Sequence, residues 1–431
     1  MKRQAFYILF SLTALSSCLE NPVMTVGIVN EKEDPTVATK PSDPFTDDDG
    51  SLVFQGELIS KGKGDTIEKG FCWSTVSNNP GIHDNHIAMV SDTSVTTFTY
   101  KLTGVSGDTT YYWRAYAQNS YGCDYGEVQS CQTPAIWVAK QELPSDSRGR
   151  GAVFMLCNRI YITCGVKFFG QAFVGDTWEY SIASNQWAQS DSISFPGGNR
   201  DYPVVFTIGN LAFVGTGRQT STLCFNDFYQ FNADSKKWTT VATPNNLGAR
   251  YEATAFSFNG NGYLVGGLTA AGKSAFNDVW QYNPVNNLWV KKNNFPSNFY
   301  GGIGISGANC AFAGFGDAAE AARTLWEYDD ATDSWSVYAQ LPPEATSKIY
   351  SGVIIQNTMY FMDGNYGIWA LNMSNKTWKK KPANLPIDFV NETSDLVDRF
   401  QAILTTGNSN SIYVGLGFCN LLYEYHPLWD N

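Results

Sequence analysis

A motif that recurs six times after about residue 135 constrains the fold more than any other feature of this sequence. Each copy holds an aromatic residue, then Tyr, Phe or Leu two residues later, and in the first five copies a Trp nine residues after the first aromatic. A period of roughly 43–54 residues is typical of chains built from similar supersecondary units. The first position holds Trp178, Tyr229, Trp280, Trp326, Trp369 and Tyr423, the second Tyr180, Phe231, Tyr282, Tyr328, Leu371 and Tyr425, and the outer Trp is Trp187, Trp238, Trp289, Trp335 or Trp378.

The segments around these aromatics predict four short strands in each copy. An apolar run that ends in Gly comes before the first aromatic, as in Tyr161–Gly165 and Tyr263–Gly267, and turn residues such as Asn283–Asn287 follow it. This pattern resembles the repeats of the kelch and galactose-oxidase-like superfamily. The resemblance implies an all-β chain in which residues 134–431 form a six-bladed kelch-type β-propeller.

The way the ring closes can also be predicted. The sixth copy reaches Tyr425, and the only Trp beyond it, Trp429, lies too close to fill the outer position. Trp137, in contrast, precedes the first full copy and is followed by a Pro, as each outer Trp is. We therefore expect residues 136–141 to supply the outer strand of the last blade, so that no sheet edge stays unpaired at the joint.

Residues 34–133 predict a separate small β-sandwich. Alternating runs at Ser51–Ile59, Ile67–Ser74, Thr96–Leu102 and Thr110–Ala117 are bounded by turn residues. The segments Gly70–Thr75 and Tyr112–Asn119 resemble the fibronectin type III-like modules of Bacteroidetes surface lipoproteins. That resemblance implies a spacer rather than a ligand-binding domain.

The first residues are typical of an export signal. Lys2 and Arg3 precede a short apolar stretch, and Leu15-Ser16-Ser17-Cys18 resembles the end of a bacterial lipoprotein signal. The resemblance implies a signal peptide over residues 1–17, a lipidated Cys18 and a linker over residues 18–33. We expect a cell-envelope protein held at the outer membrane, facing the periplasm or the cell surface, by its lipid alone.

Candidate ligand-binding residues lie where the chain enters each inner strand of the expected ring. A basic residue stands there in five of the six copies, and two positions further on the residues are mostly aromatic or charged. Such a funnel would hold carboxylates through guanidinium groups and stack sugars on tyrosines. Alternatively, the basic residues pair with acids or carbonyls of neighbouring loops. The candidates are Arg148, Arg150, Arg200, Tyr202, Arg250, Glu252, Tyr300, Lys348, Tyr350 and Arg399, with Asn298 as the non-basic member of the first position.

Two further groups of acids belong to this expectation. The connection Ile387–Asp398 is long and acidic, so it could act as a counter-ion or lid for the funnel. Asp176, Asp227 and Asp278 precede the aromatic strands, and we interpret them as turn-capping residues.

Composition excludes several classes of function. The net charge of −11 argues against general nucleic-acid binding, and three His residues are too few for a multi-histidine metal centre. The resemblance implies that a copper oxidase would need two His in the propeller, where only His426 occurs. No Cys-x-x-Cys occurs, so we expect no zinc site and no cofactor, and the eight cysteines after Cys18 are predicted to be buried free thiols. Within the propeller, Asp-box and Gly-x-Ser-x-Gly motifs do not occur, which argues against sialidases and serine hydrolases.

Three functions stay open at this point. The first is binding of a glycan or another anionic or polyhydroxylated ligand on one face of the propeller. The second is an enzyme similar to bacterial sialic acid mutarotases or epimerases, with Glu252 beside Arg250 as general base. The third is a platform for adhesion to a protein partner.

Overall fold

The computed structural model describes residues 33–431 except 42, 46–48, 64–67, 90–95, 168–171, 190–192, 245, 273, 318–321, 347, 366, 384, 387–400, 406–409 and 418. The expected signal peptide, Cys18, Arg399 and the acidic connection 387–398 lie outside the described residues. Across the described part, no helix has the length and apolar character to cross a membrane.

The first domain is a β-sandwich of two antiparallel sheets. Phe54 of one sheet stacks on Trp113 of the other, with ring centroids 4.9 Å apart, and both side chains are buried. Alternation along the strands places these aromatics on the inner faces. The strands are β1 (Thr36–Thr39), β2 (Leu52–Ser60) and β5 (Thr97–Leu102) in one sheet, and β4 (Asn85–Met89), β3 (Glu68–Ser74), β6 (Thr110–Gln118), β7 (Cys123–Tyr125) and β8 (Gln129–Gln132) in the other.

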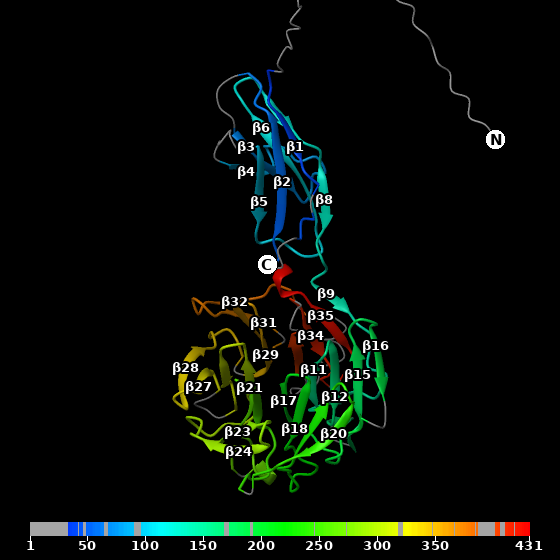
Figure 1. Cartoon of the computed structure of the whole chain (residues 1–431), viewed down its shortest axis with the longest axis vertical. Helices are drawn as coiled ribbons and strands as arrows, with labels where there is room; N and C mark the ends of the chain where they lie inside the picture. Colours follow the sequence, from blue (N-terminus) through cyan, green and yellow to red (C-terminus); the bar gives the residue numbers. More distant parts are fainter. Residues whose placement is uncertain are drawn as a thin grey trace, which may run out of the picture.

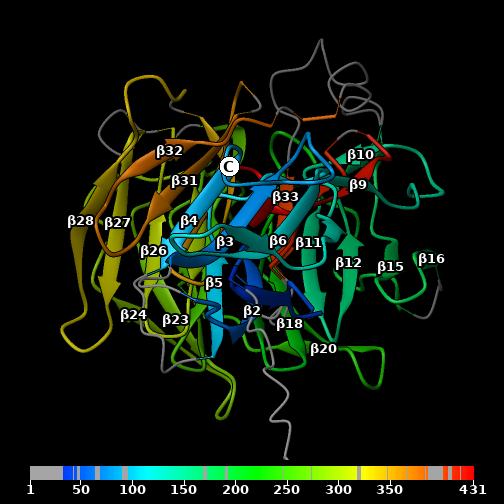
Figure 2. The ribbon, with the colours of Figure 1, turned by 90° about the horizontal axis from the view of Figure 1, so that it is seen from above.

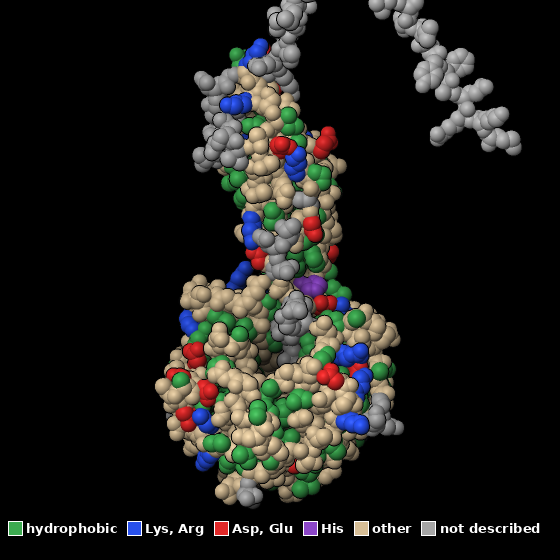
Figure 3. All heavy atoms as spheres, viewed as in Figure 1, with side chains coloured by type: hydrophobic (Ala, Val, Ile, Leu, Met, Phe, Trp, Pro, Cys, Tyr) green, Lys and Arg blue, Asp and Glu red, His purple; other side chains and the backbone are tan. Residues whose placement is uncertain are grey.

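The rest of the chain forms a ring of six four-stranded antiparallel sheets, here called blades 1–6 (Figure 1). The inner strands surround a central axis, and Figure 3 shows the ring hollowed at its centre. Blade 1 contains β11 (Ala152–Leu156), β12 (Arg159–Thr163), β15 (Thr177–Ser181) and β16 (Gln186–Gln189); blade 2 contains β17 (Val204–Ile208), β18 (Leu211–Gly215), β19 (Phe228–Asn232) and β20 (Lys237–Val241); blade 3 contains β21 (Thr254–Phe258), β22 (Asn261–Val265), β23 (Val279–Asn283) and β24 (Leu288–Lys292).

The remaining blades follow the same order from the inside outward. Blade 4 contains β25 (Ile303–Ser306), β26 (Ala311–Gly314), β27 (Thr324–Asp329) and β28 (Ser334–Gln340); blade 5 contains β29 (Ile349–Ile355), β30 (Thr358–Asp363), β31 (Ile368–Asn372) and β32 (Trp378–Lys380); blade 6 contains β33 (Gln401–Thr405), β34 (Ile412–Gly415), β35 (Leu422–Tyr425) and β9 (Trp137–Ala139). Outside the blades lie β10 (Arg148–Gly149), β13 (Val166–Lys167), β14 (Ala172–Phe173) and the short 3-10 helices η3 (Ala270–Gly272) and η4 (Pro427–Trp429).

The ring closes through the strand that precedes blade 1. β9 pairs with β35 so that Trp137 lies opposite Tyr425, and the two rings stack with centroids 4.4 Å apart. The first and last parts of the propeller therefore share one sheet, and closure covers the edge that β35 would otherwise expose.

The repeated aromatics pack each blade against the one before it. Phe206 stacks on Phe213 within blade 2, and Tyr282 of blade 3 packs against Phe213 at 5.2 Å. The outer Trp289 donates a 2.7 Å hydrogen bond to the carbonyl of Ala242 in blade 2. The aromatic pattern is thus a pattern of contacts between blades as well as within them.

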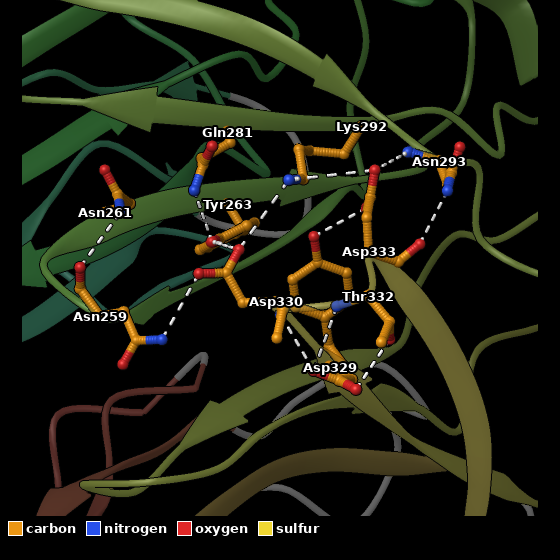
Figure 4. A network of polar contacts seen from close by, with 12 residues as sticks. Asn259, Asn261, Tyr263, Gln281, Lys292, Asn293, Asp329, Asp330, Thr332 and Asp333 are labelled. Carbon is orange, nitrogen blue, oxygen red and sulfur yellow. Dashed lines mark hydrogen bonds and ion pairs between the residues drawn. The ribbon is translucent and has the colours of Figure 1, made fainter.

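Polar contacts add to this packing between blades 3 and 4 (Figure 4). Asp330 of blade 4 accepts a 2.8 Å hydrogen bond from the Tyr263 hydroxyl of blade 3, and Lys292 lies 3.9 Å from both Asp330 and Asp333. The buried tyrosine hydroxyl is thereby satisfied across the blade boundary.

The first domain contacts the propeller through the C-terminal residues of the chain. Trp429 of η4 packs edge-on against Phe45, and its carbonyl accepts a 2.7 Å hydrogen bond from the backbone of Gly107. From above, the first domain lies within the outline of the propeller, between β28 and β16 (Figure 2). Trp429, which does not fit the repeat, therefore joins the two domains.

The described cysteines are all free thiols. Cys72, Cys164 and Cys419 are buried and four others are half-buried, but Cys157 is exposed, so the prediction of a buried thiol is wrong there.

Candidate functional site

Three of the predicted ligand-binding arginines form ion pairs inside their own blades. Arg148, Arg200 and Arg250 have no exposed surface, although they lie where the sequence placed them, just before the inner strands. The expectation that they face an open funnel is wrong, and the alternative, pairing with a loop acid, is what the structure has. The pairs are Arg148 with Asp176 (2.7 and 2.8 Å), Arg200 with Asp227 (2.5 and 3.0 Å) and Arg250 with Asp278 (2.5 and 2.9 Å).

The sequence predicted that these three aspartates cap turns. The structure shows instead that they are the acids of the buried ion pairs. Each uses both carboxylate oxygens for a guanidinium, and Asp176 and Asp278 also accept a hydrogen bond from the indole N–H two residues later. Burial by itself would raise the pKa of Asp278, but the Arg250 guanidinium holds it below its ordinary value. Bidentate pairing of this kind fixes the connection between two strands.

In the other blades a different residue occupies the position of these arginines. In blade 4 the equivalent residue is Phe299: its backbone N–H donates to the carbonyl of Phe276, as that of Arg250 donates to the carbonyl of Phe225. Asn298, which the sequence placed at this position, lies one residue earlier and is exposed. Thr324 stands where blades 1–3 have the acid, so both members of the pair are replaced together in blade 4. In blade 5 the position holds Lys348, which is half-buried, and the Arg399 of blade 6 lies outside the described residues.

Two residues further along the chain, the backbone turns left-handed at the entrance of the central channel. We call Arg150, Tyr202, Glu252, Gly301 and Tyr350 the entrance ring. The first four lie two residues before their inner strands, and Tyr350 is the second residue of β29. The first four have φ angles of 59°, 50°, 51° and 63°. Only Gly adopts such angles without cost, so the three side chains are retained against about 1–3 kcal/mol of strain each.

Asp201 links two of the arginines at this entrance. Its carboxylate lies 3.1 Å from Nε of Arg218 and 3.5 Å from Nη1 of Arg150. Burial raises the pKa of Asp201, while the two guanidinium groups oppose that rise. Asp201 is almost completely buried, whereas both arginines are partly exposed toward the entrance.

Two tyrosines face these guanidinium groups. The Arg218 guanidinium lies 4.2 Å from the ring centre of Tyr251 and 5.2 Å from that of Tyr202. Arg150 lies 4.9 Å from the ring centre of Tyr202. The stacked cations hold the aromatic rings in place at the edge of the entrance.

Glu252 is a half-buried carboxylate between the cations of the entrance and the carboxylate of Asp317. Burial raises its pKa, Arg218, Lys348 and Arg150 lower it, and Asp317 raises it further. Within the part of the chain that the structure describes, no group donates a hydrogen bond to its carboxylate. A Cβ placed on Gly301 would lie 2.7 Å from Asp317 Oδ2 and 3.8 Å from Glu252 Oε2, so the missing side chain leaves room for both acids.

Tyr300 is not a member of the entrance ring, although the sequence placed it there. Because blade 4 is shifted by one residue, Gly301 takes that place and Tyr300 pairs through its backbone with Asp317. Tyr350 does belong to the entrance, and Lys348 lies near its ring at 5.8 Å from the centre. The sequence analysis did not predict Asp201, Arg218, Tyr251 or Asp317 as site residues. Arg218 and Asp317 share a position that could have indicated them, because each directly follows a Gly-x-Gly segment at the end of the second strand of its blade.

A cavity of about 230 Å³ lies directly inside the entrance ring, lined by the beginnings of the inner strands. Among the described residues, no group of three or more His, Cys, Asp or Glu side chains is arranged as metal ligands would be.

Comparison with known proteins agrees with this architecture. The Kelch motif model matches residues 249–296, which contain blade 3 and its Arg250–Asp278 pair. Kelch domain-containing protein 10 of Rattus norvegicus is 26% identical over 234 residues, covering 49% of this chain and 57% of the relative. Kelch domain-containing protein 3 of Bos taurus is 25% identical over 146 residues, or 32% of this chain and 38% of the relative.

The chain therefore spans little more than half the length of the first relative and less than half of the second. Among solved structures, one described as "Structure of YjhT" aligns with 64% of this chain and 91% of its own, with 16% identity and a TM-score of 0.49. The matched motif, the relatives and the six four-stranded sheets together identify the second domain of this chain as a kelch-repeat β-propeller.

Proposed function

We propose that the propeller binds a polyhydroxylated ligand, such as a glycan end with at most one acid group, at the entrance ring. The observation that carries this proposal is the strained backbone at Arg150, Tyr202 and Glu252. Gly at these positions would relieve the strain, as Gly301 does, yet the three positions keep side chains that face the entrance of the channel. Strain of this kind is concentrated at binding and active sites.

The chemistry of the entrance favours hydroxyl groups over a strongly charged anion. Three cations, Arg150, Arg218 and Lys348, are balanced by the carboxylates of Asp201, Glu252 and Asp317. Such a site offers both donors and acceptors to hydroxyls, and the tyrosine rings offer flat apolar faces. A single carboxylate on the ligand could still bind an arginine in bidentate fashion.

A glycan array followed by calorimetry tests this proposal. Tyr202→Gly should lower the affinity for the bound glycan about tenfold, the equivalent of losing about 1.4 kcal/mol, without lowering the melting temperature. Cys157→Gly is the matched control, because Cys157 also has a positive φ, 50°, but lies at the opposite end of the channel. A protein that binds no glycan, or whose binding is unaffected by Tyr202→Gly, would contradict the proposal and leave a protein partner as the candidate.

A second function, acid–base catalysis on the bound sugar, is supported by Glu252. A carboxyl with a raised pKa and a like-charged neighbour holds its proton more readily than an ordinary carboxyl, so it is suited to both donate and accept a proton. In mutarotation the anomeric hydroxyl loses a proton and the ring oxygen gains one as the bond between the anomeric carbon and the ring oxygen breaks, and the reverse transfers close the ring on the other face. NMR of sugar anomers with the wild-type protein and with Glu252→Gln would test it, since an enzyme should accelerate interconversion and the variant should not.

We also propose that the chain is a cell-envelope lipoprotein. In this proposal the first domain is a fibronectin type III-like spacer, and a lipid on Cys18 is the anchor. The contact of Trp429 with Phe45 supports a spacer that holds the propeller in a set orientation.

A further inference from the structure

The central channel continues well beyond the entrance ring. The cavity of about 230 Å³ inside the ring shares Val153, Val205, Ala255, Gly304 and Gly352 with a second cavity of about 430 Å³ toward the other face. The shared residues come from the inner strands of blades 1–5. The two cavities are therefore successive parts of one passage along the axis of the ring.

The wall of this passage differs in chemistry from its entrance. Of the described residues that line either cavity, none carries a charge, and many are Gly, Ala, Val or Ser. Val205 is half-exposed between the buried Val204 and Phe206, so its side chain faces the channel. A wall of uncharged side chains suits an uncharged chain better than a second charged group.

In blades 1–5 the entrance ring and the uncharged wall meet within one residue along the chain. Arg150 is followed by the lining residue Gly151, Tyr202 by Pro203, Glu252 by Ala253 and Gly301 by Gly302, while Tyr350 belongs to both the ring and the wall. A ligand whose head is held by the ring would thus direct any substituent straight into the passage.

We infer that this protein recognises its ligand end-on, with a hydroxylated head at the entrance ring and an uncharged, unbranched chain along the axis. The inference rests on the proposed function and adds the class of ligand. Because the blades surround the axis, a chain can enter the passage only by its end, whereas an open groove would accept the middle of a polymer.

A homologous series of alkyl glucuronides tests the inference. Methyl, butyl and octyl glucuronide carry the same carboxylated sugar head and differ only in the length of an uncharged chain. Calorimetry should show affinity rising by up to about fourfold for each methylene that enters the channel. Equal affinities across the series would overturn the inference.

Two matched variants locate the effect. Val205→Phe narrows the channel and should abolish the gain from chain length while leaving the affinity for methyl glucuronide unchanged. Val337→Phe places the same substitution on the outer strand β28, where Val337 is 55% exposed, and should preserve the gain. A gain that survives Val205→Phe would show that the alkyl chain binds outside the channel.

The same data separate the two proposals. If methyl glucuronide binds and Tyr202→Gly weakens it, but chain length has no effect, the proposed function stands and end-on recognition fails. If no member of the series binds, end-on recognition fails, and the glycan array decides the proposed function by itself.

Discussion

The hydroxyl of Tyr425 donates a 2.7 Å hydrogen bond to Asp430, whose other carboxylate oxygen accepts a 2.9 Å bond from the backbone of Ala383. The contact ties blade 6 to blade 5 with the second-last residue of the chain. Blades 1, 3 and 4 have the same arrangement, in which a tyrosine hydroxyl donates to the residue five positions later, and that residue accepts a hydrogen bond from a backbone N–H of the preceding blade. These are Tyr180 with Asn185, Tyr282 with Asn287 and Tyr328 with Asp333.

Removing this carboxylate should destabilise the ring. Asp430→Ala leaves a buried hydroxyl and a backbone N–H without their partner, which costs about 1–3 kcal/mol. Asp430→Asn is the control and should be close to neutral, because Asn185 and Asn287 make both bonds with one amide oxygen. Thermal unfolding of the purified variants measures both; equal losses in the two variants would contradict the assigned role.

The closing strand should depend on its aromatic residue. Trp137→Ala removes the ring stacked on Tyr425 and should lower the free energy of unfolding by about 3 kcal/mol. Trp137→Phe should recover much of it, since an aromatic ring can still stack there. Denaturant unfolding checks the order wild type, Phe, Ala; an Ala variant as stable as the wild type would show that β9 adds little to closure.

The buried ion pairs should affect stability and leave ligand affinity unchanged. Arg250→Ala strands the Asp278 carboxylate and should cost about 3–5 kcal/mol. The double variant Arg250→Phe with Asp278→Thr copies the Phe299 and Thr324 of blade 4 and should regain most of that loss. Any change in glycan affinity measured with the folded double variant would mean that Arg250 contacts the ligand after all.

Glu252 should make the free protein less stable at neutral pH. Its pKa in the folded state is raised above that of the unfolded chain, chiefly by burial, so its ionisation opposes folding as the pH rises past the ordinary value of 4.5. Glu252→Gln should therefore be more stable than the wild type at pH 7, and the difference should vanish near pH 4. Unfolding curves at the two pH values test this, and a variant less stable at pH 7 would contradict the sign.

Anchoring should depend on Cys18. Stable attachment to a membrane needs more than one acyl chain, and in the proposed lipoprotein the thiol of Cys18 carries the diacylglycerol. Replacing Cys18 with Ala removes that thiol and therefore the anchor. The protein should then move from the membrane fraction to the soluble fraction after cell lysis. An unchanged distribution would contradict the lipoprotein proposal.

The sequence alone predicted the features that recur from one repeat to the next along the chain. Aromatic and Gly positions recur with each blade, so the number of blades and the place of Trp137 can be counted along the chain. The polar partners also have a local signature, although we did not predict them: a tyrosine is followed by Asn or Asp five residues later in four blades, whereas Phe231 and Leu371 are followed by Lys.

Only the tertiary structure decided which basic residues face the channel. Arg148, Arg200 and Arg250 look like a funnel in the sequence, but the return of the chain through two strands brings an aspartate 27 or 28 residues later against each guanidinium. A buried charge needs such a partner, so the arginine turns into the blade and the next exposed positions form the entrance. The meeting of Glu252 with Arg218 and Asp317, from three different blades, has no local signature, because the curvature of the ring and not the spacing along the chain sets that distance.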